Sequence, residues 1–259
     1  PATGANRAMT GRYAPGSTFK TVSTLALLDA GLRPDETVPC PATATVNGRE
    51  FRNVDGFVLG PVPFSQDFAQ SCNTAFVELS SRLAPGDLSK AGASVGLGGD
   101  WVVGAPAFTG DVPVEQTPLD VAAATIGQGQ VLASPLAMAQ VAATIASGGW
   151  IEPKLVLEAS PPATSGKAPQ PDAERLATVR ELMRLVAIDG TASALADVPG
   201  ELVHAKTGTA EYGTEVPPRT HAWTVGFQGD VAFAVLIEDG VSGTGAAVPV
   251  AEAFLRALP

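Results

Sequence analysis

The chain has 259 residues, of which 45% are hydrophobic and 16% are charged, so it can bury a substantial core, and extensive disorder is excluded. Its 16 Lys and Arg against 26 Asp and Glu give a formal net charge of −10, which argues against nucleic acid or anionic lipid as a partner. No apolar run approaches the roughly 18 residues of a membrane helix. Two cysteines and two histidines lack zinc-site spacing, and no phosphate-binding loop occurs, so the sequence predicts no metal and no cofactor.

Helices and loops are predicted over the first 150 residues. In chain order, we expect a helix from Tyr13 to Ala30 that is buried on all sides, a turn-rich segment over 35–67, a helix from Thr74 to Leu83, a glycine-rich loop over 92–118, and helices over 117–126 and 135–147. The last of these begins with Ser134 as N-cap and Pro135 at its first position.

Strands gather late in the chain. After a Pro- and Ser-rich surface loop over 158–172, we expect an amphipathic helix over 173–188, strands over 201–207, 221–227 and 231–238, and a final helix over 248–258. The last two strands are linked at hairpin length, so they should pair antiparallel. This order predicts an α+β fold, with a sheet flanked by helices and covered by an all-helical subdomain at roughly 30–190, inserted between the first helix and the strands within 201–238.

The first motif with chemical potential is Ser17-Thr18-Phe19-Lys20, which places a hydroxyl and an amine on one face of a helix start. A serine becomes a nucleophile when a base lies within hydrogen-bond reach, and a buried lysine with a lowered pKa can be that base. The alternative is an ordinary lysine at a helix end.

The second motif, Ser71-Cys72-Asn73, lies at a loop-to-helix junction. Ser71 could relay a proton, while the Asn73 amide could orient the substrate and Lys20. The alternative is a plain N-cap, since both Ser and Asn are favoured there.

The third motif, Lys206-Thr207-Gly208-Thr209, is predicted to end a strand. Lys206 offers a positive charge, and Thr207 and Thr209 offer hydroxyls to a carboxylate. Gly208 would leave room for a ligand at the strand edge. The alternative is a polar strand end running into a turn.

The order S-x-x-K, S-x-N, K-T-G resembles the serine penicillin-recognising superfamily. Further motifs are similar to class B penicillin-binding proteins: Tyr13 to Lys20, Ser71 to Phe76, Gly127-Gln-Gly-Gln130 with Ser134-Pro135, Lys206 to Glu211, and His221-Ala-Trp223. The resemblance spans nearly the whole chain.

This resemblance implies a peptidoglycan D,D-transpeptidase that cross-links stem peptides ending in D-Ala-D-Ala and is acylated by β-lactams. It implies that Ser17 is the nucleophile and Lys20 its base, and that Ser71, Asn73 and Lys206 assist catalysis. Thr207, Gly208 and Thr209 would bind the substrate, and the backbone N–H groups of Ser17 and Thr209 would form the oxyanion hole. Cell-wall synthesis or division proteins would be its partners.

Two other functions compete with this one. A class A β-lactamase needs a glutamate that activates water, and the nearest candidate, Glu115, lacks the asparagine expected shortly after it. Class D β-lactamases carry an apolar residue where Asn73 stands. A non-catalytic β-lactam sensor or scaffold would keep all three motifs.

In this family, strands, a non-catalytic domain and a membrane anchor precede the serine helix, whereas 16 residues precede Ser17. We therefore expect a fragment that lacks N-terminal strands. Its parent would be anchored at the extracytoplasmic face of the bacterial membrane.

The remaining residues of interest receive structural predictions. Cys40 and Cys72 are expected to be two separate buried thiols, with a disulfide beside Ser71 as the alternative that an exported domain permits. His204 and His221 are expected to pack or to form surface hydrogen bonds, and Trp223 to be a core or cleft-wall aromatic.

Overall fold

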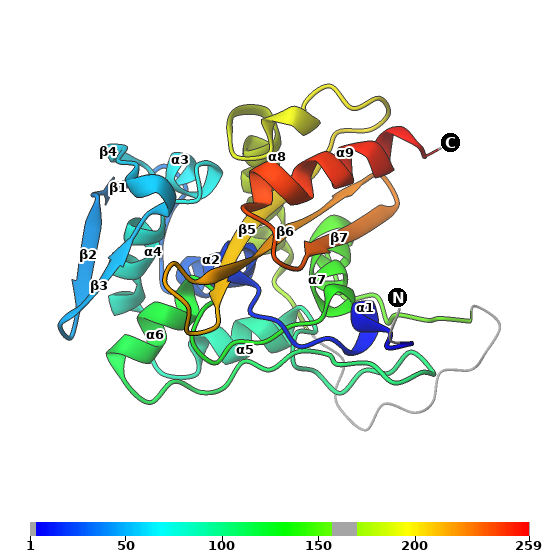
Figure 1. The fold of residues 1–259 in the computed structure, drawn as a ribbon, viewed down its shortest axis with the longest axis horizontal. Helices are drawn as coiled ribbons and strands as arrows, with labels where there is room; N and C mark the ends of the chain where they lie inside the picture. The colour runs from blue at the N-terminus through cyan, green and yellow to red at the C-terminus, as the bar shows by residue number, and fades with distance from the viewer. Residues whose placement is uncertain (1–3, 157–169, 259) are drawn as a thin grey trace.

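The computed structural model describes residues 4–156 and 170–258, and its arrangement is shown in Figure 1. The strands of this described part are β1 Thr37–Cys40, β2 Thr43–Val46, β3 Arg49–Arg52, β4 Gly60–Pro63, β5 His204–Tyr212, β6 Arg219–Gln228 and β7 Val231–Ile237. The α-helices are α1 Arg7–Thr10, α2 Lys20–Asp29, α3 Phe64–Ala69, α4 Asn73–Leu79, α5 Asp87–Ser94, α6 Pro118–Thr125, α7 Pro135–Ser147, α8 Ala173–Asp189 and α9 Val248–Arg256. The α+β class is confirmed.

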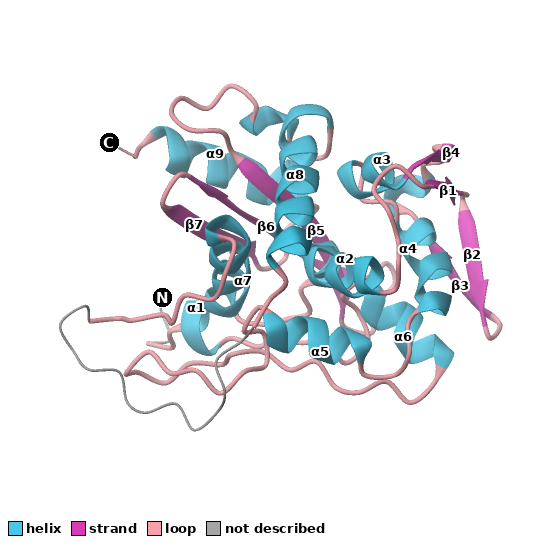
Figure 2. Ribbon diagram, turned by 180° about the vertical axis from the view of Figure 1, so that it is seen from behind, coloured by secondary structure: helices cyan, strands magenta, loops and turns pink. Residues whose placement is uncertain are grey.

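The main sheet is antiparallel, in the order β5-β6-β7. Helices α7 and α8 pack against one face and α9 lies on the other, as the two opposite views show (Figures 1 and 2). The buried helix α2 lies between this sheet and a second region made of β1–β4, α3 and α4 (Figure 1). No helix in the described residues is long and apolar enough to cross a membrane.

The strand β5 is longer than the sequence predicted. It continues to Tyr212 because residues 210–212 pair in register with β6, where Ala210 lies opposite His221 and Tyr212 opposite Arg219. The expectation that Lys206-Thr207-Gly208 ends a strand was therefore wrong, since this motif lies in the middle of β5. The predicted hairpin between β6 and β7 is confirmed.

The segment 35–67 is not simply turns, and the region 30–190 is not wholly helical. Strands β2 and β3 form a hairpin around Asn47 and Gly48, which both have positive φ (48° and 82°), as a tight two-residue turn requires. Strands β1 and β4 pair antiparallel around this hairpin. The sequence reasoning identified Asn47-Gly48 as a turn but not the four-residue strands beside it.

Several helices also differ from expectation, and the short helices α1 and α3 were not predicted. The serine helix begins as a 3₁₀ turn over Gly16–Phe19, and only from Lys20 is it α-helical. Helix α5 was not predicted, because its apolar stripe is short: Leu88, Ala91 and Gly92 are its buried residues. The predicted helices 117–126, 135–147 and 173–188 correspond to α6, α7 and α8.

Candidate active site

The turn that carries Ser17 packs directly on the middle of β5. A Cβ placed on Gly16, whose φ is +52°, would lie 2.6 Å from the carbonyl oxygen of Thr209. A Cβ on Gly208 would lie 2.9 Å from both the Pro15 oxygen and the Thr18 nitrogen. The missing side chain of Gly208 thus makes room for the serine turn, and not for a ligand at the strand edge as the sequence reasoning supposed.

The glycine-rich stretch after α6 supports the same turn from another side. The Gly16 N–H donates to the Gly127 carbonyl at 3.0 Å, and a Cβ on Gly127 would lie 2.0 Å from the Gly16 oxygen. Gly127 has a φ of +70°, so both its backbone conformation and its close approach require glycine.

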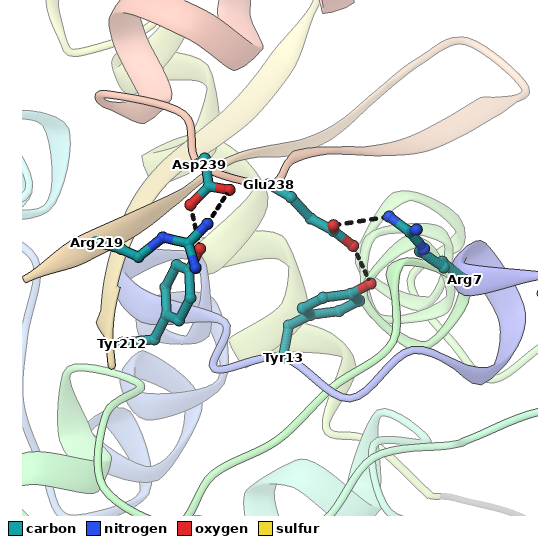
Figure 3. Close-up of polar contacts among 6 residues, drawn as sticks. All are labelled: Arg7, Tyr13, Tyr212, Arg219, Glu238 and Asp239. Carbon is teal, nitrogen blue, oxygen red and sulfur yellow. Dashed lines mark hydrogen bonds and ion pairs between the residues drawn. The ribbon is translucent and has the colours of Figure 1, made fainter. Parts of the chain in front are cut away.

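The residues that precede Ser17 are tied to the main sheet. Trp223 is fully buried in β6 and donates from Nε1 to the Ala14 carbonyl at 3.0 Å, which confirms it as a core aromatic. Glu238, just after β7, accepts a hydrogen bond from the Tyr13 hydroxyl (Figure 3). It also forms an ion pair with Arg7, whose Nη1 lies 2.7 Å from Glu238 Oε2. Burial, together with Glu238, raises the pKa of Tyr13 to about 12. These contacts fix the path of the chain into the serine turn.

Ser71 occupies a left-handed position at the end of α3. Its φ is +62°, its N–H donates to the Phe68 carbonyl at 3.1 Å, and the Cys72 N–H donates to the Asp67 carbonyl at 2.8 Å. This pair of bonds is a Schellman motif, in which the left-handed residue is usually glycine. A serine held here keeps a side chain at a position where the backbone conformation disfavours one, which is typical of functional sites.

The plain N-cap alternative for Ser71 and Asn73 is not what the structure contains. Cys72 is the N-cap residue of α4, and its sulfur accepts from the Ala75 N–H at 3.3 Å. The Ser71 hydroxyl instead accepts from Lys206 Nζ at 2.8 Å and from Lys20 Nζ at 3.4 Å.

All three motifs meet around these side chains. Lys20 Nζ donates to Asn73 Oδ1 at 2.7 Å and to the Ser71 carbonyl at 2.8 Å. Ser17 Oγ donates to the same Asn73 oxygen at 3.4 Å. Asn73 therefore links the hydroxyl to the amine, and Ser71 links the two lysines.

Lys20 and Lys206 are fully buried. Burial disfavours the charged ammonium, so each loses its proton more readily than a lysine at the surface. Burial lowers the pKa of Lys20 well below its ordinary value, and the charge of Lys206 lowers it further. Burial also lowers the pKa of Lys206 to about 7. A lysine with a lowered pKa is partly unprotonated near neutral pH and can accept a proton.

The two threonines of the third motif differ in their partners. The Thr207 hydroxyl is buried and shares a hydrogen bond with the hydroxyl of Thr191. The Thr209 hydroxyl accepts from the Gly243 N–H at 3.2 Å, which leaves its own proton free to be donated. Thr209 is thus equipped to donate to a carboxylate at the edge of the sheet.

Sequence reasoning missed Asn53, which holds the second motif in place. Its Oδ1 accepts from the N–H groups of Asn73 and Thr74 at 2.8 and 3.1 Å, so it caps the first turn of α4. Its Nδ2 donates to the carbonyls of Pro41 and Phe57 at 3.0 and 2.8 Å. Asn53 lies in the turn-rich segment, 20 residues before Asn73, where no sequence pattern marks it.

Cys40 and Cys72 form a disulfide, so the expectation of two separate thiols was wrong. Their Cα atoms are 6.2 Å apart, within the usual range for a bridge. Both sulfurs and a carboxylate oxygen of Asp67 lie within 4.8 Å of one another, the one group of three potential metal ligands in the described residues. With the sulfurs bonded to each other, this group has no thiolate to offer a metal.

The histidines have packing contacts, as predicted. His221 stacks on Tyr212 with ring centroids 3.9 Å apart, and the Tyr212 hydroxyl and Arg219 both donate to Asp239 (Figure 3). His204 stacks on Phe227 at 4.4 Å.

Glu115, the nearest candidate for a β-lactamase base, is buried elsewhere. Its Oε2 accepts from the Gly86 N–H at 2.8 Å, and it makes no hydrogen bond to the described side chains that surround Ser17.

Comparison with known proteins agrees with this arrangement. Residues 3–257 match the penicillin binding protein transpeptidase domain. The chain is 35% identical to the peptidoglycan D,D-transpeptidase PbpA of Mycolicibacterium smegmatis, over 97% of this chain and 56% of that protein, so it spans about half the length of this relative.

Solved structures give the same result. The ceftriaxone acyl-enzyme of penicillin-binding protein A from M. tuberculosis superposes with a TM-score of 0.82 at 31% identity, covering 98% of this chain and 63% of the other. A chain from a peptidoglycan synthase complex that coordinates polymerization and crosslinking superposes with a TM-score of 0.80 at 28% identity, covering 97% of this chain and 47% of the other. With its motifs assembled on this fold, the chain belongs to the family of penicillin-binding protein transpeptidase domains.

Proposed function

We propose that this chain is the catalytic domain of a peptidoglycan D,D-transpeptidase, which cross-links stem peptides through an acyl-enzyme on Ser17. The observation that carries the proposal is the hydrogen-bond network in which Asn73 Oδ1 accepts from both Ser17 Oγ and Lys20 Nζ. The name of the 35%-identical relative supports the same activity.

In the proposed acylation, Ser17 Oγ attacks the carbonyl carbon between the two D-alanines and its proton passes to Lys20. The negative charge that develops on the carbonyl oxygen would be stabilised by the N–H groups of Ser17 and Thr209. The C–N bond then breaks, and the departing amine takes a proton from Lys20 through the Ser71 hydroxyl, which hydrogen-bonds Lys20. The product is an ester on Ser17 and free D-alanine.

In the proposed second half, the amine of another stem peptide attacks the ester. Lys20 and Ser71 remove the amine proton, and Ser17 leaves with a proton, which restores the enzyme. The carboxylate of the donor peptide would be held by the charge of Lys206 and the hydroxyls of Thr207 and Thr209. Gly208 would then serve binding by keeping β5 against the serine turn.

The partners and location follow from the same assignment. We expect β-lactams to acylate Ser17, since a solved relative at 31% identity is a ceftriaxone acyl-enzyme. Similarity to a chain of a peptidoglycan synthase complex supports cell-wall synthesis proteins as partners. We place the domain on the extracytoplasmic side of the bacterial membrane, where a Cys40–Cys72 disulfide is chemically stable.

The test uses a synthetic peptide that ends in D-Ala-D-Ala, with and without an acceptor amine. We expect free D-alanine and, with the acceptor, a cross-linked product, and neither with Ser17→Ala. If a penicillin acylates the chain but no stem peptide releases D-alanine, the chain is a sensor or scaffold.

A second assay separates the proposal from a serine β-lactamase. Hydrolysis of the acyl-enzyme requires a base that activates water, and Glu115 is bonded to Gly86 instead. We therefore expect a penicilloyl adduct that persists for many minutes. Steady turnover of a chromogenic cephalosporin that is lost in Ser17→Ala would identify a β-lactamase.

A further inference from the structure

Thr191, in the turn after α8, makes a hydrogen bond to the third motif that the proposed reaction does not explain. Its Oγ1 lies 2.5 Å from Thr207 Oγ1, and either oxygen could be the donor. In the part of the chain that the structure describes, neither hydroxyl makes another hydrogen bond. Thr207 is assigned to the carboxylate of the substrate, whereas Thr191 has no role so far.

Contacts on both sides of Thr191 fix its backbone. Its N–H donates to the Ala69 carbonyl, at the end of α3, at 3.2 Å. Gly190 makes this approach possible, because a Cβ there would lie 2.4 Å from the same carbonyl oxygen. The Thr191 carbonyl accepts from Thr244 Oγ1 at 2.9 Å. Since the backbone is held and a β-branched side chain has few rotamers, the Thr191 hydroxyl has a defined direction.

Thr209, two residues after Thr207 on β5, is supported in a similar way. Its hydroxyl accepts from the Gly243 N–H at 3.2 Å, and a backbone N–H can only donate. The proton of the Thr209 hydroxyl is therefore free for a ligand. Gly243 directly precedes Thr244, which holds Thr191, so one short segment supports both threonines of the motif.

The number of protons decides the direction of the Thr191–Thr207 hydrogen bond once a substrate is bound. A threonine hydroxyl donates one hydrogen bond and accepts two, whereas a carboxylate can only accept. If Thr207 donated to Thr191, it would have no proton left for the carboxylate. If Thr191 donates to Thr207, the Thr207 proton is available, and each hydrogen bond in such a chain strengthens the next.

We propose that Thr191 is a positioning residue of the carboxylate site: its hydroxyl donates to Thr207 and thereby directs the one proton of Thr207 to the carboxylate of the substrate. This inference rests on the proposed function, in which Thr207 and Thr209 hold that carboxylate. Thr191 contacts no substrate atom in this scheme and acts only through Thr207.

The test measures the second-order rate constant of acylation for benzylpenicillin and for its methyl ester, on the wild type and on Thr191→Val. Valine has nearly the shape of threonine but no hydroxyl, and the ester masks the carboxylate of the penicillin. With benzylpenicillin, Thr191→Val should lower the rate constant about three- to tenfold, which corresponds to one hydrogen bond. With the ester, the change should stay within about twofold, because no charged acceptor is present.

Two further variants are controls. Thr191→Ser keeps the hydroxyl and should restore most of the rate constant with benzylpenicillin. Thr178→Val makes the same substitution on α8, where the half-buried Thr178 hydroxyl donates within its own helix to the Glu174 carbonyl at 3.0 Å. Its rate constants with both compounds should equal those of the wild type.

An equal loss with both compounds would overturn the proposal, because Thr191 would then have a structural role alone. A rate constant with benzylpenicillin that stays the same or rises would also overturn it, since Thr191 would not be the donor. Thr191→Ala removes the same hydroxyl without adding an atom and should show the same loss. If neither Thr191→Val nor Thr191→Ala folds, the hydroxyl serves the fold and the proposal fails. If neither compound acylates the wild type, the proposed function fails, and this inference with it.

Discussion

Replacing Asn53 by alanine should destabilise the domain by more than any exposed substitution. The amide makes four hydrogen bonds to backbone groups: with the N–H groups of Asn73 and Thr74 and the carbonyls of Pro41 and Phe57. Each bond contributes about 1 kcal/mol net, so Asn53→Ala should lower the free energy of unfolding by about 4 kcal/mol. For a chain of this size, that corresponds to a fall in Tm of about 10 °C.

Urea unfolding of wild type and variant measures this loss. Asn53→Asp keeps the oxygen acceptor but not the two N–H donors of the amide, so its free energy of unfolding should lie between those of the wild type and Asn53→Ala. Asn6→Ala is the control, since it removes an exposed cap at one end of a four-residue helix and should cost about 1 kcal/mol. A loss below about 1 kcal/mol for Asn53→Ala would refute the reasoning. Acylation of the folded variant should also slow, because Asn73 is no longer held.

Four further predictions follow from single contacts. Gly208→Ala should lower the free energy of unfolding by about 1–3 kcal/mol and slow acylation, because its Cβ would lie 2.9 Å from Pro15 O and Thr18 N; unchanged urea unfolding would contradict this. Cys40→Ala should cost about 3–4 kcal/mol, since the bridge closes a 32-residue loop, and a wild-type chain insensitive to reductant would contradict it. Because the pKa of Lys206 is about 7 when folded and near its ordinary value when unfolded, the unfolded chain binds more protons above pH 7, and stability should rise with pH from there; Lys206→Met should flatten that rise in urea titrations. Lys20→Arg cannot give up a proton, so acylation by penicillin should fall by about 10² to 10⁴, and a rate within a few-fold of wild type would reject Lys20 as the base.

The sequence predicted which side chains of the three motifs belong to one candidate site, because their types, order and spacing are specific. Ser17, Lys20, Ser71, Asn73 and Lys206 all lie in one hydrogen-bonded network. The long helices were also predictable, since α7 and α8 have clear boundaries and periodic apolar residues.

What the sequence did not predict depends on contacts between distant segments. Asn53 caps α4 from another element, so the usual search for a cap beside the helix could not find it. From the sequence, Gly208 was predicted to leave room for a ligand at the strand edge. The close packing of the serine turn on β5, which requires glycine there, could not be read from the sequence. The pairing of Cys40 with Cys72 was open for the same reason.

The left-handed conformation of Ser71 also runs against local preference. Glycine is favoured where the Schellman motif requires a positive φ, so serine gave no sign of this turn. The Ser71 hydroxyl is the atom that both Lys20 and Lys206 contact.

The central claim is that Ser17 is the nucleophile of a penicillin-binding transpeptidase site. Intact mass spectrometry after incubation with benzylpenicillin tests it most directly, on the wild-type chain and on Ser17→Ala. We predict a mass gain of one penicillin on the wild type and none on the variant. An unmodified wild type, or an adduct that persists on Ser17→Ala, would contradict the account.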